Sequence, residues 1–579
     1  MLIMQSDAFI RLFQPNAVCA ARRLPMSLAL ALHNTDDESW WRFRPMASTE
    51  MLALVASLFF ALACNSAFLS GVLSGRSWAD PSAWLIGCAM LVMLTAMHLL
   101  LLLLILHRWI AKPLLGVLMI ATAFATYYIE RFGVYLDPTM VRNVLRTDVA
   151  EAGELIGIGI LPHFLLYAVL PMIVLWRVRV SRRPRWRAVA ARGMATVLAG
   201  GLLVGSVLLV FQDFSALIRN QRELRYLITP ANYVYSGTRV LMTETRQAAK
   251  PRHVVGADAR RAPSWAARTR PVMLVIAVGE TARAANWGLN EYTRQTTPGL
   301  AALNVLNFPD VRACGTNTET ALPCMFSAIG RRDYDEDRIR GSESLLHVLN
   351  RAGFQVLWRD NQSGCKGVCE GLQQQRFEPA KLPELCAGGR CLDDVLLNGL
   401  DTVARDAQGN LVVVLHMLGN HGPAYAQRYP TAFRRFGPAC ETGDLRQCSR
   451  ASIVNAYDNA LLYTDHILAS TIAHLKQQGS RFDTALLYVS DHGESLGEKG
   501  LYLHGVPYAI APDEQTRVPM VWWLSDGFVS SFGLDRDCLR QQTGKPWRHD
   551  ELFHSVLGLL QVDTQVYESK LDISAQCRR

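Results

Sequence analysis

The segment MLALVASLFFALACNSAFLSGVLSG, at residues 51–75, contains no charged side chain. It is longer than the roughly 20 residues that a helix needs to cross the hydrocarbon core of a bilayer, so it predicts a membrane span. Similar apolar stretches follow at residues 83–106, 113–129, 155–176 and 193–212. The first stretch begins too late in the chain, and is followed by too many others, to be a cleaved signal peptide. The sequence therefore predicts five transmembrane helices, of which the third is the shortest.

The arginines predict the orientation of these spans, because short cytoplasmic loops are enriched in Lys and Arg. The connection between the fourth and fifth spans contains Arg177, Arg179, Arg182, Arg183, Arg185, Arg187 and Arg192. The segment before the first span also contains arginines, at Arg22, Arg23, Arg42 and Arg44. A chain that starts in the cytoplasm and crosses five times ends outside, so everything after about residue 213 is expected to be periplasmic.

The positive charge of the chain belongs to this apolar part. The protein has 579 residues, of which 50% are hydrophobic and 19% charged, with a formal net charge of +9. Residues 1–250 hold 24 Lys+Arg and 14 Asp+Glu, so the remainder is close to neutral. A nucleic-acid-binding protein carries its basic residues on the folded domain that contacts phosphate. We therefore expect no nucleic-acid partner.

The cysteines point to the same compartment. Ten of the 13 lie beyond residue 300, and eight of these form close pairs in the sequence: Cys314/Cys324, Cys365/Cys369, Cys386/Cys391 and Cys440/Cys448. Cys538 and Cys577 are left without an assigned partner. Paired cysteines are typical of disulfides in an oxidising compartment. Zinc ligation is the alternative, but the gaps vary and no CxxC occurs.

The second half of the chain has the pattern of an α/β domain. Continuous apolar runs at residues 271–279, 411–418 and 484–490 alternate with helical patterns such as 342–352 and 451–476. Strands that are apolar on both faces belong to sheets covered by helices. We therefore predict a doubly wound α/β domain at residues 271–579, behind a membrane-surface helix at about 213–247 and an unpatterned linker at 250–270.

Polar residues follow the three strands directly. Open α/β sheets bind ligands beyond the carboxyl ends of their strands. Those positions hold Glu280, His421, Asp491 and His492. Two carboxylates and two imidazoles are a ligand set that zinc accepts, so the sequence predicts a metal site there. Surface loops without chemistry are the alternative interpretation.

Two further histidines are set aside. Asp465 and His466 form another Asp-His pair, but they lie in a helical stretch, where a solvated helix face explains them. His416 lies within an apolar run and is interpreted as a hydrogen-bonded core residue.

The segment CGTNTETALPC, from Cys314 to Cys324, supplies hydroxyl groups. A helix that begins here would point its backbone N–H groups at an anion. A hydroxyl beside a divalent metal becomes a nucleophile near neutral pH. A capped loop with no chemistry is the alternative.

Five motifs together resemble a known family. They are GETAR (279–283), the Cys314–Cys324 segment, GCKGVC (364–369), GNHGPAY (419–425) and SDHGESLGEKGLYLHG (490–505). They are similar to the phosphoethanolamine transferases that modify lipid A, which include the mobile colistin-resistance enzymes and belong to the alkaline-phosphatase/sulfatase superfamily. The resemblance covers about residues 50–560, and the first 45 residues or so have no counterpart in it.

The resemblance implies roles for single residues. It implies that Thr318 is the nucleophile, with Thr316 and Thr320 as the neighbours most easily confused with it. It implies that Glu280, Thr318, Asp491 and His492 hold zinc. The implied substrate-binding residues are Ser363, Lys366, His421 and His504, together with Asn143, Thr147 and Glu151 from residues 141–155 of the membrane part. The last three are spaced by four, which predicts one helical face.

The implied reaction is a double displacement. Thr318 takes phosphoethanolamine from phosphatidylethanolamine, diacylglycerol leaves, and a lipid A phosphate accepts the group, with His421 or His504 as the acid. The resemblance implies one firmly held zinc ion and leaves a second open. It further implies an inner-membrane enzyme with a periplasmic catalytic domain, a monomer, and polymyxin resistance through lower negative surface charge.

Other functions remain open at this point. A sulfatase of the same fold would need a Cys or Ser in C/S-x-P-x-R, which the nucleophile segment lacks. A phosphoglycerol transferase shares the anchor and the threonine, but the Cys-clamped segment and GCKGVC argue against it. A non-catalytic membrane sensor would lack metal ligands, and none is missing. The acceptor is open among lipid A, Kdo, core heptose and a periplasmic glucan.

Overall fold

The computed structural model describes residues 44–147, 149–248, 251–387 and 390–578. The expected cytoplasmic segment at residues 1–48 lies almost entirely outside these ranges. The described residues from Met46 onward form one compact unit.

The first half of the described chain consists of long apolar helices. Four are long and apolar enough to span a bilayer: α3 (Pro81–Ile105), α4 (Ala111–Phe132), the run Ile160–Arg177, and α9 (Arg185–Leu209). α1 (Thr49–Ala63) and α2 (Ser66–Val72) meet at an angle of 57° and provide a fifth candidate if the bent pair counts as one span. The third predicted span proves to be a full 22-residue helix.

Packing and exposure within this half suit a lipid environment. α3 packs against both α1 and α9. Much of the outer surface is apolar: Val197 of α9 is 71% exposed and Leu208 is 65% exposed. Exposed apolar patches of this extent are unfavourable in water and favourable against acyl chains.

Shorter helices follow α4 and α9, the third and fifth predicted spans. They are α5 (Pro138–Arg146), α6 (Val149–Leu155), α10 (Phe211–Asn220), the 3-10 turn η3 (Arg222–Leu227) and α11 (Ala231–Ala248). The single surface helix expected over residues 213–247 is therefore wrong. Pro230 lacks a backbone N–H donor and cannot continue a helix, and the side chain of Asn65 pairs with both backbone groups of Thr229 in its place.

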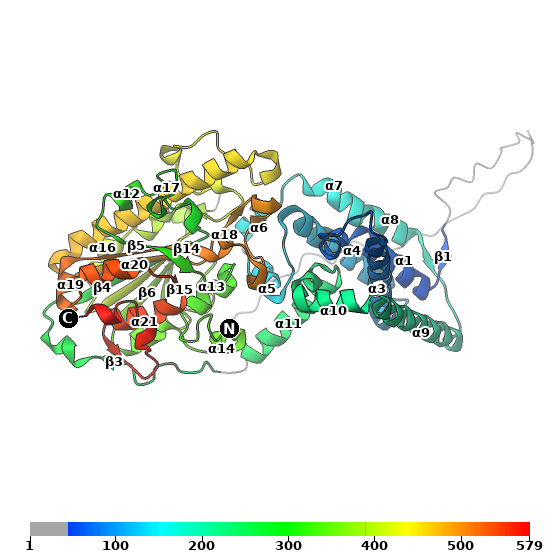
Figure 1. Ribbon diagram of the computed structural model, residues 1–579, viewed down its shortest axis with the longest axis horizontal. Helices are drawn as coiled ribbons and strands as arrows, with labels where there is room; N and C mark the ends of the chain where they lie inside the picture. Colours follow the sequence, from blue (N-terminus) through cyan, green and yellow to red (C-terminus); the bar gives the residue numbers. More distant parts are fainter. Residues whose placement is uncertain (1–43, 148, 249–250, 388–389, 579) are drawn as a thin grey trace, which may run out of the picture. The chain divides into compact units, whose positions relative to one another are not determined.

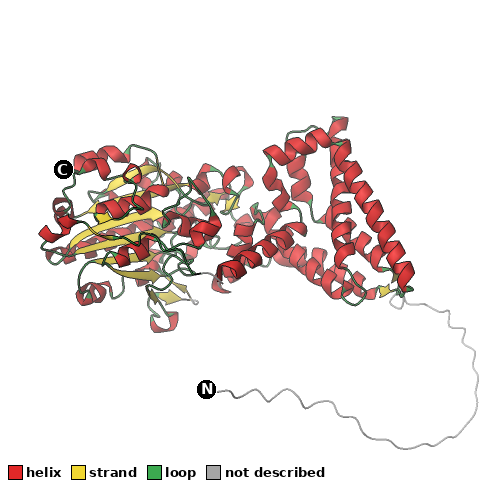
Figure 2. Ribbon diagram, turned by 90° about the horizontal axis from the view of Figure 1, so that it is seen from below, coloured by secondary structure: helices red, strands yellow, loops and turns green. Residues whose placement is uncertain are grey.

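The second half contains a mixed eight-stranded sheet covered by helices on both faces (Figures 1 and 2). Its order is β15 (Trp547–Arg548), β5 (Leu306–Arg312), β14 (Arg517–Leu524), β11 (Asp483–Ser490), β4 (Val272–Gly279), β10 (Leu411–His416), β6 (Gln355–Asp360) and β7 (Gln373–Arg376). The three predicted strands are the central neighbours β11, β4 and β10, and they pair in parallel. β14 pairs antiparallel with both of its neighbours, so the sheet is not parallel throughout.

The apolar runs are continuous because both faces of the sheet are buried. Along β4, Val272, Leu274, Ile276 and Val278 pack into one core. Met273, Val275 and Ala277 pack into the other. The long helix α17 (Arg450–Gln477) covers the second face, and α15 (Leu345–Arg351) and α21 (Asp550–Leu559) cover the first.

The linker expected at residues 250–270 is ordered over its described part, residues 251–270. β3 (Arg260–Arg261) pairs with β16 (Val562–Asp563). The indole of Trp265 donates a hydrogen bond to the Leu560 carbonyl and packs against Phe354. The segment joins the α/β domain through backbone pairing, which its composition does not reveal.

All ten cysteines beyond residue 300 form disulfides. The four close pairs are confirmed, and Cys538 joins Cys577. Zinc ligation by these cysteines is therefore excluded.

Candidate metal-dependent active site

The site lies at the carboxyl ends of β4 and β11. Gly279 and Ser490 are paired in register, so the residues that follow them, Glu280 and Asp491, emerge side by side. The ligand oxygens and nitrogen of Glu280, Asp491 and His492 lie within 4.8 Å of one another, and all three residues are buried. The sequence prediction that these three converge is confirmed.

Thr318 reaches the same point from a different element. It is the first residue of α13 (Thr318–Met325), whose N-cap is Asn317. Its Oγ1 lies 3.1 and 3.3 Å from the two carboxylate oxygens of Glu280 and 3.4 Å from Nε2 of His492. The hydroxyl, a carboxylate and an imidazole therefore face one common position at the start of a helix.

The donor set fits a divalent cation. Two carboxylates and one imidazole nitrogen are ordinary zinc ligands. Oδ2 of Asp491 is buried and has no hydrogen-bond donor among the described residues. Burial, and then the neighbouring Glu280 carboxylate, raise the pKa of Asp491. Two buried carboxylates this close need a cation to be ionised together, so the residues present suit a bound metal.

The neighbouring threonines are turned elsewhere. Thr316 donates its hydroxyl hydrogen bond to the Val506 carbonyl at 2.7 Å. The backbone N–H of Thr320 caps on Asn317, and the Thr320 hydroxyl makes no hydrogen bond to Glu280 or His492. Of the three threonines, Thr318 is the one placed against the metal-ligand set.

The two other predicted histidines lie beside this set. The ring centroids of His421 and His504 are 5.5 Å apart, and those of His504 and His492 are 4.4 Å apart. Nδ1 of His504 lies 2.8 Å from Oε2 of the fully buried Glu494, whose other oxygen accepts a hydrogen bond from Tyr425. The carboxylate fixes the proton on Nδ1 and leaves Nε2 of His504 for the site.

The loop that carries His421 passes close to Glu280. Gly419 has a positive φ of 53°, and a Cβ there would lie 2.8 Å from the Glu280 carbonyl oxygen. The same carbonyl accepts a hydrogen bond from the N–H of Asn420. Only glycine allows this approach.

Lys366 and Ser363 occupy the GCKGVC side of the site. Nζ of Lys366 is 2.7 Å from Oγ of Ser363 and 3.0 Å from Oε1 of Glu319. Gln362, in the same loop, donates a hydrogen bond of 2.9 Å to Oε2 of Glu280. Lys366 has a positive φ of 49°, and backbone strain of this kind concentrates at functional sites.

Glu319 has a role that sequence reasoning missed. Its side chain is fully buried directly after Thr318, and its carboxylate contacts Lys366, Arg340 of α14 (Glu336–Arg340) and Arg146 of α5. Burial opposes its ionisation, but these three cations outweigh burial and lower the pKa of Glu319. An acid between two threonines in the Cys314–Cys324 segment was the available signal. Sequence reasoning also missed the roles of Gln362, which contacts Glu280, and Glu494, which contacts His504.

The three predicted residues of the membrane part do not lie on one continuous helical face. α5 ends at Arg146, and Thr147 is extended, with ψ of 132°. The Thr147 hydroxyl donates to the Asn143 carbonyl, the acceptor that its own N–H would use in a continuing helix. Glu151 belongs to the next helix, α6, and its side chain lies outside what the structure describes.

Of the two histidines set aside, His416 is a core residue as predicted. It is buried, and its Nδ1 lies 2.7 Å from Asp360. The solvated helix face proposed for Asp465 and His466 is confirmed for His466, which is exposed, and wrong for Asp465. Asp465 is buried and accepts hydrogen bonds from the N–H groups of Gly299 and Leu300, at the start of α12 (Pro298–Ala301). It caps a neighbouring helix because α12 packs against α17.

Comparison with known proteins agrees with this geometry. Residues 273–562 match the Sulfatase family model, and residues 94–245 match the model described as phosphoethanolamine transferase EptA/EptB. The chain is 37% identical to phosphoethanolamine transferase EptA of Escherichia coli (strain K12) over 93% of its own length and 98% of the relative. It is 36% identical to phosphatidylethanolamine transferase Mcr-1 of Escherichia coli over 84% of this chain and 91% of that one.

A solved structure matches the membrane and soluble parts together. The integral membrane lipooligosaccharide phosphoethanolamine transferase A of Neisseria meningitidis superposes with a TM-score of 0.88 at 37% identity, covering 92% of this chain and 100% of that one. Such identity over nearly the whole of both chains, together with a threonine placed against a candidate metal-binding cluster, shows that the protein is a member of the phosphoethanolamine transferase family, with a sulfatase-type soluble domain behind membrane-spanning helices.

Proposed function

We propose that the protein transfers phosphoethanolamine from phosphatidylethanolamine to a phosphate of lipid A, with Thr318 as the covalent carrier. The observation that carries this proposal is the placement of Oγ1 of Thr318 within 3.4 Å of both Glu280 and His492 at the start of α13. The donor and acceptor classes follow the names of the relatives, and the membrane anchor suits a reaction between two lipids.

In the first step, Oγ1 of Thr318 attacks the phosphorus of the donor while the hydroxyl proton passes to the Glu280 carboxylate that accepts its hydrogen bond. The bond from phosphorus to the glycerol oxygen breaks, and diacylglycerol leaves with a proton. The imidazolium form of His504, held at Nδ1 by the Glu494 carboxylate, would give that proton from Nε2 and keep the proton on Nδ1.

In the second step, an oxygen of the acceptor phosphate attacks the phosphothreonine. A phosphoanhydride bond forms, and Thr318 leaves and takes its proton back from Glu280, while the acceptor phosphate returns a proton to Nε2 of His504. Negative charge develops on the phosphoryl oxygens in both steps. The N–H groups at the start of α13 and the ammonium group of Lys366 stabilise that charge.

Glu280, Asp491 and His492 would hold zinc, with Thr318 as the fourth ligand. Zinc at this position supplies a Lewis acid that lowers the pKa of the threonine hydroxyl. A second zinc ion beside His421 and His504 stays a proposal.

The proposed arrangement in the cell is an inner-membrane monomer with five spans and a periplasmic catalytic domain at residues 271–579. The arginine-rich connection between α8 (Leu170–Arg177) and α9 supports this orientation, and so do five disulfides in the soluble half. Adding phosphoethanolamine to lipid A lowers its negative charge, which implies resistance to cationic polymyxins.

Mass spectrometry of lipid A from a host that expresses the protein tests the function. Wild type is expected to add phosphoethanolamine, about 123 Da from its formula, through the covalent carrier, and Thr318→Ala to add none. Thr320→Ala is the matched control and should retain the adduct. An adduct that persists in Thr318→Ala would refute the carrier, and modification of core sugar alone would move the acceptor to Kdo, heptose or another glycan.

Alkaline phosphatase fusions test the orientation. A fusion after Lys250 should be active, and one after Arg183 should be inactive. The reverse pattern would contradict the periplasmic placement.

A further inference from the structure

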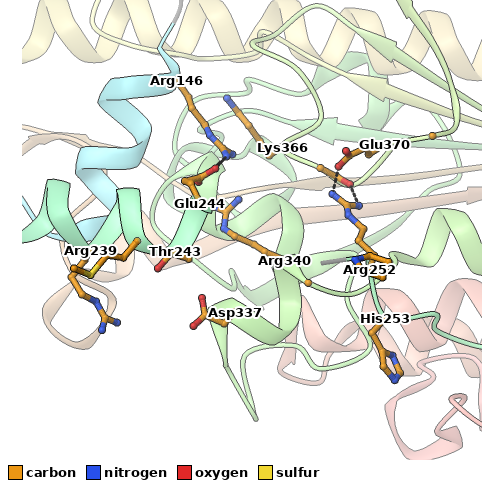
Figure 3. Close-up of a pocket in the computed structure, with 15 residues that line it drawn as sticks. Arg146, Arg239, Thr243, Glu244, Arg252, His253, Asp337, Arg340, Lys366 and Glu370 are labelled. Atoms are coloured by element: carbon orange, nitrogen blue, oxygen red, sulfur yellow. Dashed lines mark hydrogen bonds and ion pairs between the residues drawn. The ribbon is translucent and has the colours of Figure 1, made fainter. Parts of the chain in front are cut away.

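A large cavity opens beside the active site, between α11 and the catalytic domain (Figure 3). Its volume is about 1160 Å³, above the roughly 300–1,000 Å³ typical of small-molecule pockets. Its walls come from the end of α5, from α11, from the segment around Arg252, from the end of α14 and from the GCKGVC loop. It is therefore large enough for the headgroup of a glycolipid.

The cavity carries an excess of positive charge. Five cations line it, against three acids, Glu244, Asp337 and Glu370, and the buried Glu319 behind the inner wall is a fourth acid, so one positive charge stays in excess; the cations are Arg146, Arg239, Arg252, Arg340 and Lys366. Glu244 is already bonded to Arg146 at 2.9 and 3.0 Å, and Glu370 is bonded to Arg252. The charge of the cavity therefore favours an anion over a zwitterion.

Arg239 is the cation available for such an anion. It is exposed on α11, and its guanidinium makes no ion pair or hydrogen bond with any residue that the structure describes. It also borders a smaller cavity of about 210 Å³ beside Arg142. An unpaired guanidinium offers a planar set of donors that match a phosphate group.

The same stripe of α11 is apolar on either side of Arg239. Tyr235 is 52% exposed and Met242 is 54% exposed. Their spacing from Arg239, four residues before and three after, places the three side chains on one face of the helix. A cation between exposed apolar side chains suits an amphiphile with a phosphate headgroup.

The inner wall of the cavity leads to Thr318. Lys366, Arg340 and Arg146 line the cavity and also contact the carboxylate of Glu319, the residue directly after Thr318. An anion held in the cavity is therefore next to the start of α13.

We propose that this cavity binds the phosphorylated sugar headgroup of the acceptor lipid and that Arg239 is a phosphate contact that sets acceptor affinity. The inference rests on the proposed function, which it deepens. The donor headgroup is the alternative occupant of the same chemistry. The ammonium group of the donor would face cations in this cavity, where binding it would require a free carboxylate. The charge of the cavity therefore assigns the cavity to the acceptor.

The test separates the two substrates kinetically. The purified full-length protein in detergent is given fluorescent phosphatidylethanolamine, and diacylglycerol release without acceptor is measured separately from transfer to lipid A at varied concentration. Arg239→Glu is expected to raise KM for lipid A about tenfold or more, because a charged hydrogen bond becomes a repulsion. Diacylglycerol release and KM for the donor should stay unchanged, and Arg239→Lys should keep most of the affinity.

Arg219→Glu is the matched control, because Arg219 is also an exposed arginine, at the end of α10, and it borders none of the cavities described here. It should leave both KM values unchanged. A disaccharide bisphosphate without acyl chains should compete with lipid A in wild type and compete less in Arg239→Glu.

The outcomes distinguish this inference from the proposed function. Wild type that releases diacylglycerol but never modifies lipid A would remove the acceptor on which the inference rests. Wild type that modifies lipid A, with Arg239→Glu showing an unchanged KM for lipid A, would overturn the inference alone. A raised KM for the donor in Arg239→Glu would assign the cavity to phosphatidylethanolamine.

Discussion

Replacing Glu319 with Gln removes the one carboxylate that three cations share beside Thr318. The Glu319 side chain is 0% exposed, and Lys366 is 5% exposed, with no other carboxylate partner among the described residues. Arg340 and Arg146 keep Glu336 and Glu244 respectively, so Lys366 bears most of the loss. Breaking a buried ion pair from one side costs about 3–5 kcal/mol, and we expect about 3 kcal/mol here.

Thermal unfolding of the full chain in detergent, followed by tryptophan fluorescence, measures this cost. For a domain of this size, 3 kcal/mol corresponds to a fall in Tm on the order of 5 °C. Glu370→Gln is the control, because its carboxylate pairs with Arg252 while 71% exposed, and exposed pairs contribute at most about 1 kcal/mol.

A double-mutant cycle completes the test. Lys366→Met should cost less in the Glu319→Gln background than in wild type, because the buried charge is then removed together with its partner. Equal shifts for Glu319→Gln and Glu370→Gln, or full additivity with Lys366→Met, would refute the assignment of Glu319 as the shared counter-ion.

Three further predictions concern the metal site, a buried acid and a disulfide. Chelation by EDTA should abolish transfer and lower Tm, because Glu280 and Asp491 are left facing each other, and added zinc should restore both; transfer that survives chelation would contradict a metal-dependent site. Burial raises the pKa of Asp465 to about 6. The protonated side chain therefore contributes fully to folding stability below pH 3.8, and this contribution falls by about 2–3 kcal/mol as pH rises through 6. Tm measured between pH 4 and 7 should show this fall in wild type, and an Asp465→Asn variant with the same slope would disprove it. Cys577→Ser opens a loop closed over 39 residues, which should cost about 4 kcal/mol in unfolding free energy; a Tm equal to that of wild type under oxidising conditions would contradict a structural role.

Much of the site could be predicted because each ligand follows a strand directly. The apolar runs before Glu280 and Asp491 are local signals, and parallel neighbours bring their carboxyl ends to one edge. The choice of Thr318 over Thr316 and Thr320 rested on resemblance. The structure supplies the physical reason, since Thr316 bonds Val506 and only Thr318 faces Glu280.

Other expectations failed where packing overrides a local pattern. The spacing of Asn143 and Thr147 predicted one helical face, but the Thr147 hydroxyl takes the carbonyl that the helix needs to continue. Asp465 was expected on a solvated helix face because it lies in a helical stretch. It is buried because α12 packs against it, and the N–H groups at the start of α12 donate hydrogen bonds to its carboxylate. The local pattern of α17 cannot show this neighbouring helix.

Hydropathy and strand periodicity are properties of neighbouring residues, so the amino-acid order alone was enough to indicate membrane-spanning helices, the α/β domain and the residues at its strand ends. The structure was needed for the disulfide partner of Cys538, which is Cys577. It was also needed for the three-cation environment of Glu319 and the basic cavity around Arg239, which join residues from α5, α11, α14 and the GCKGVC loop. Charges so far apart in the chain interact only after folding brings them within a few ångströms, and there burial strengthens their interaction by excluding water.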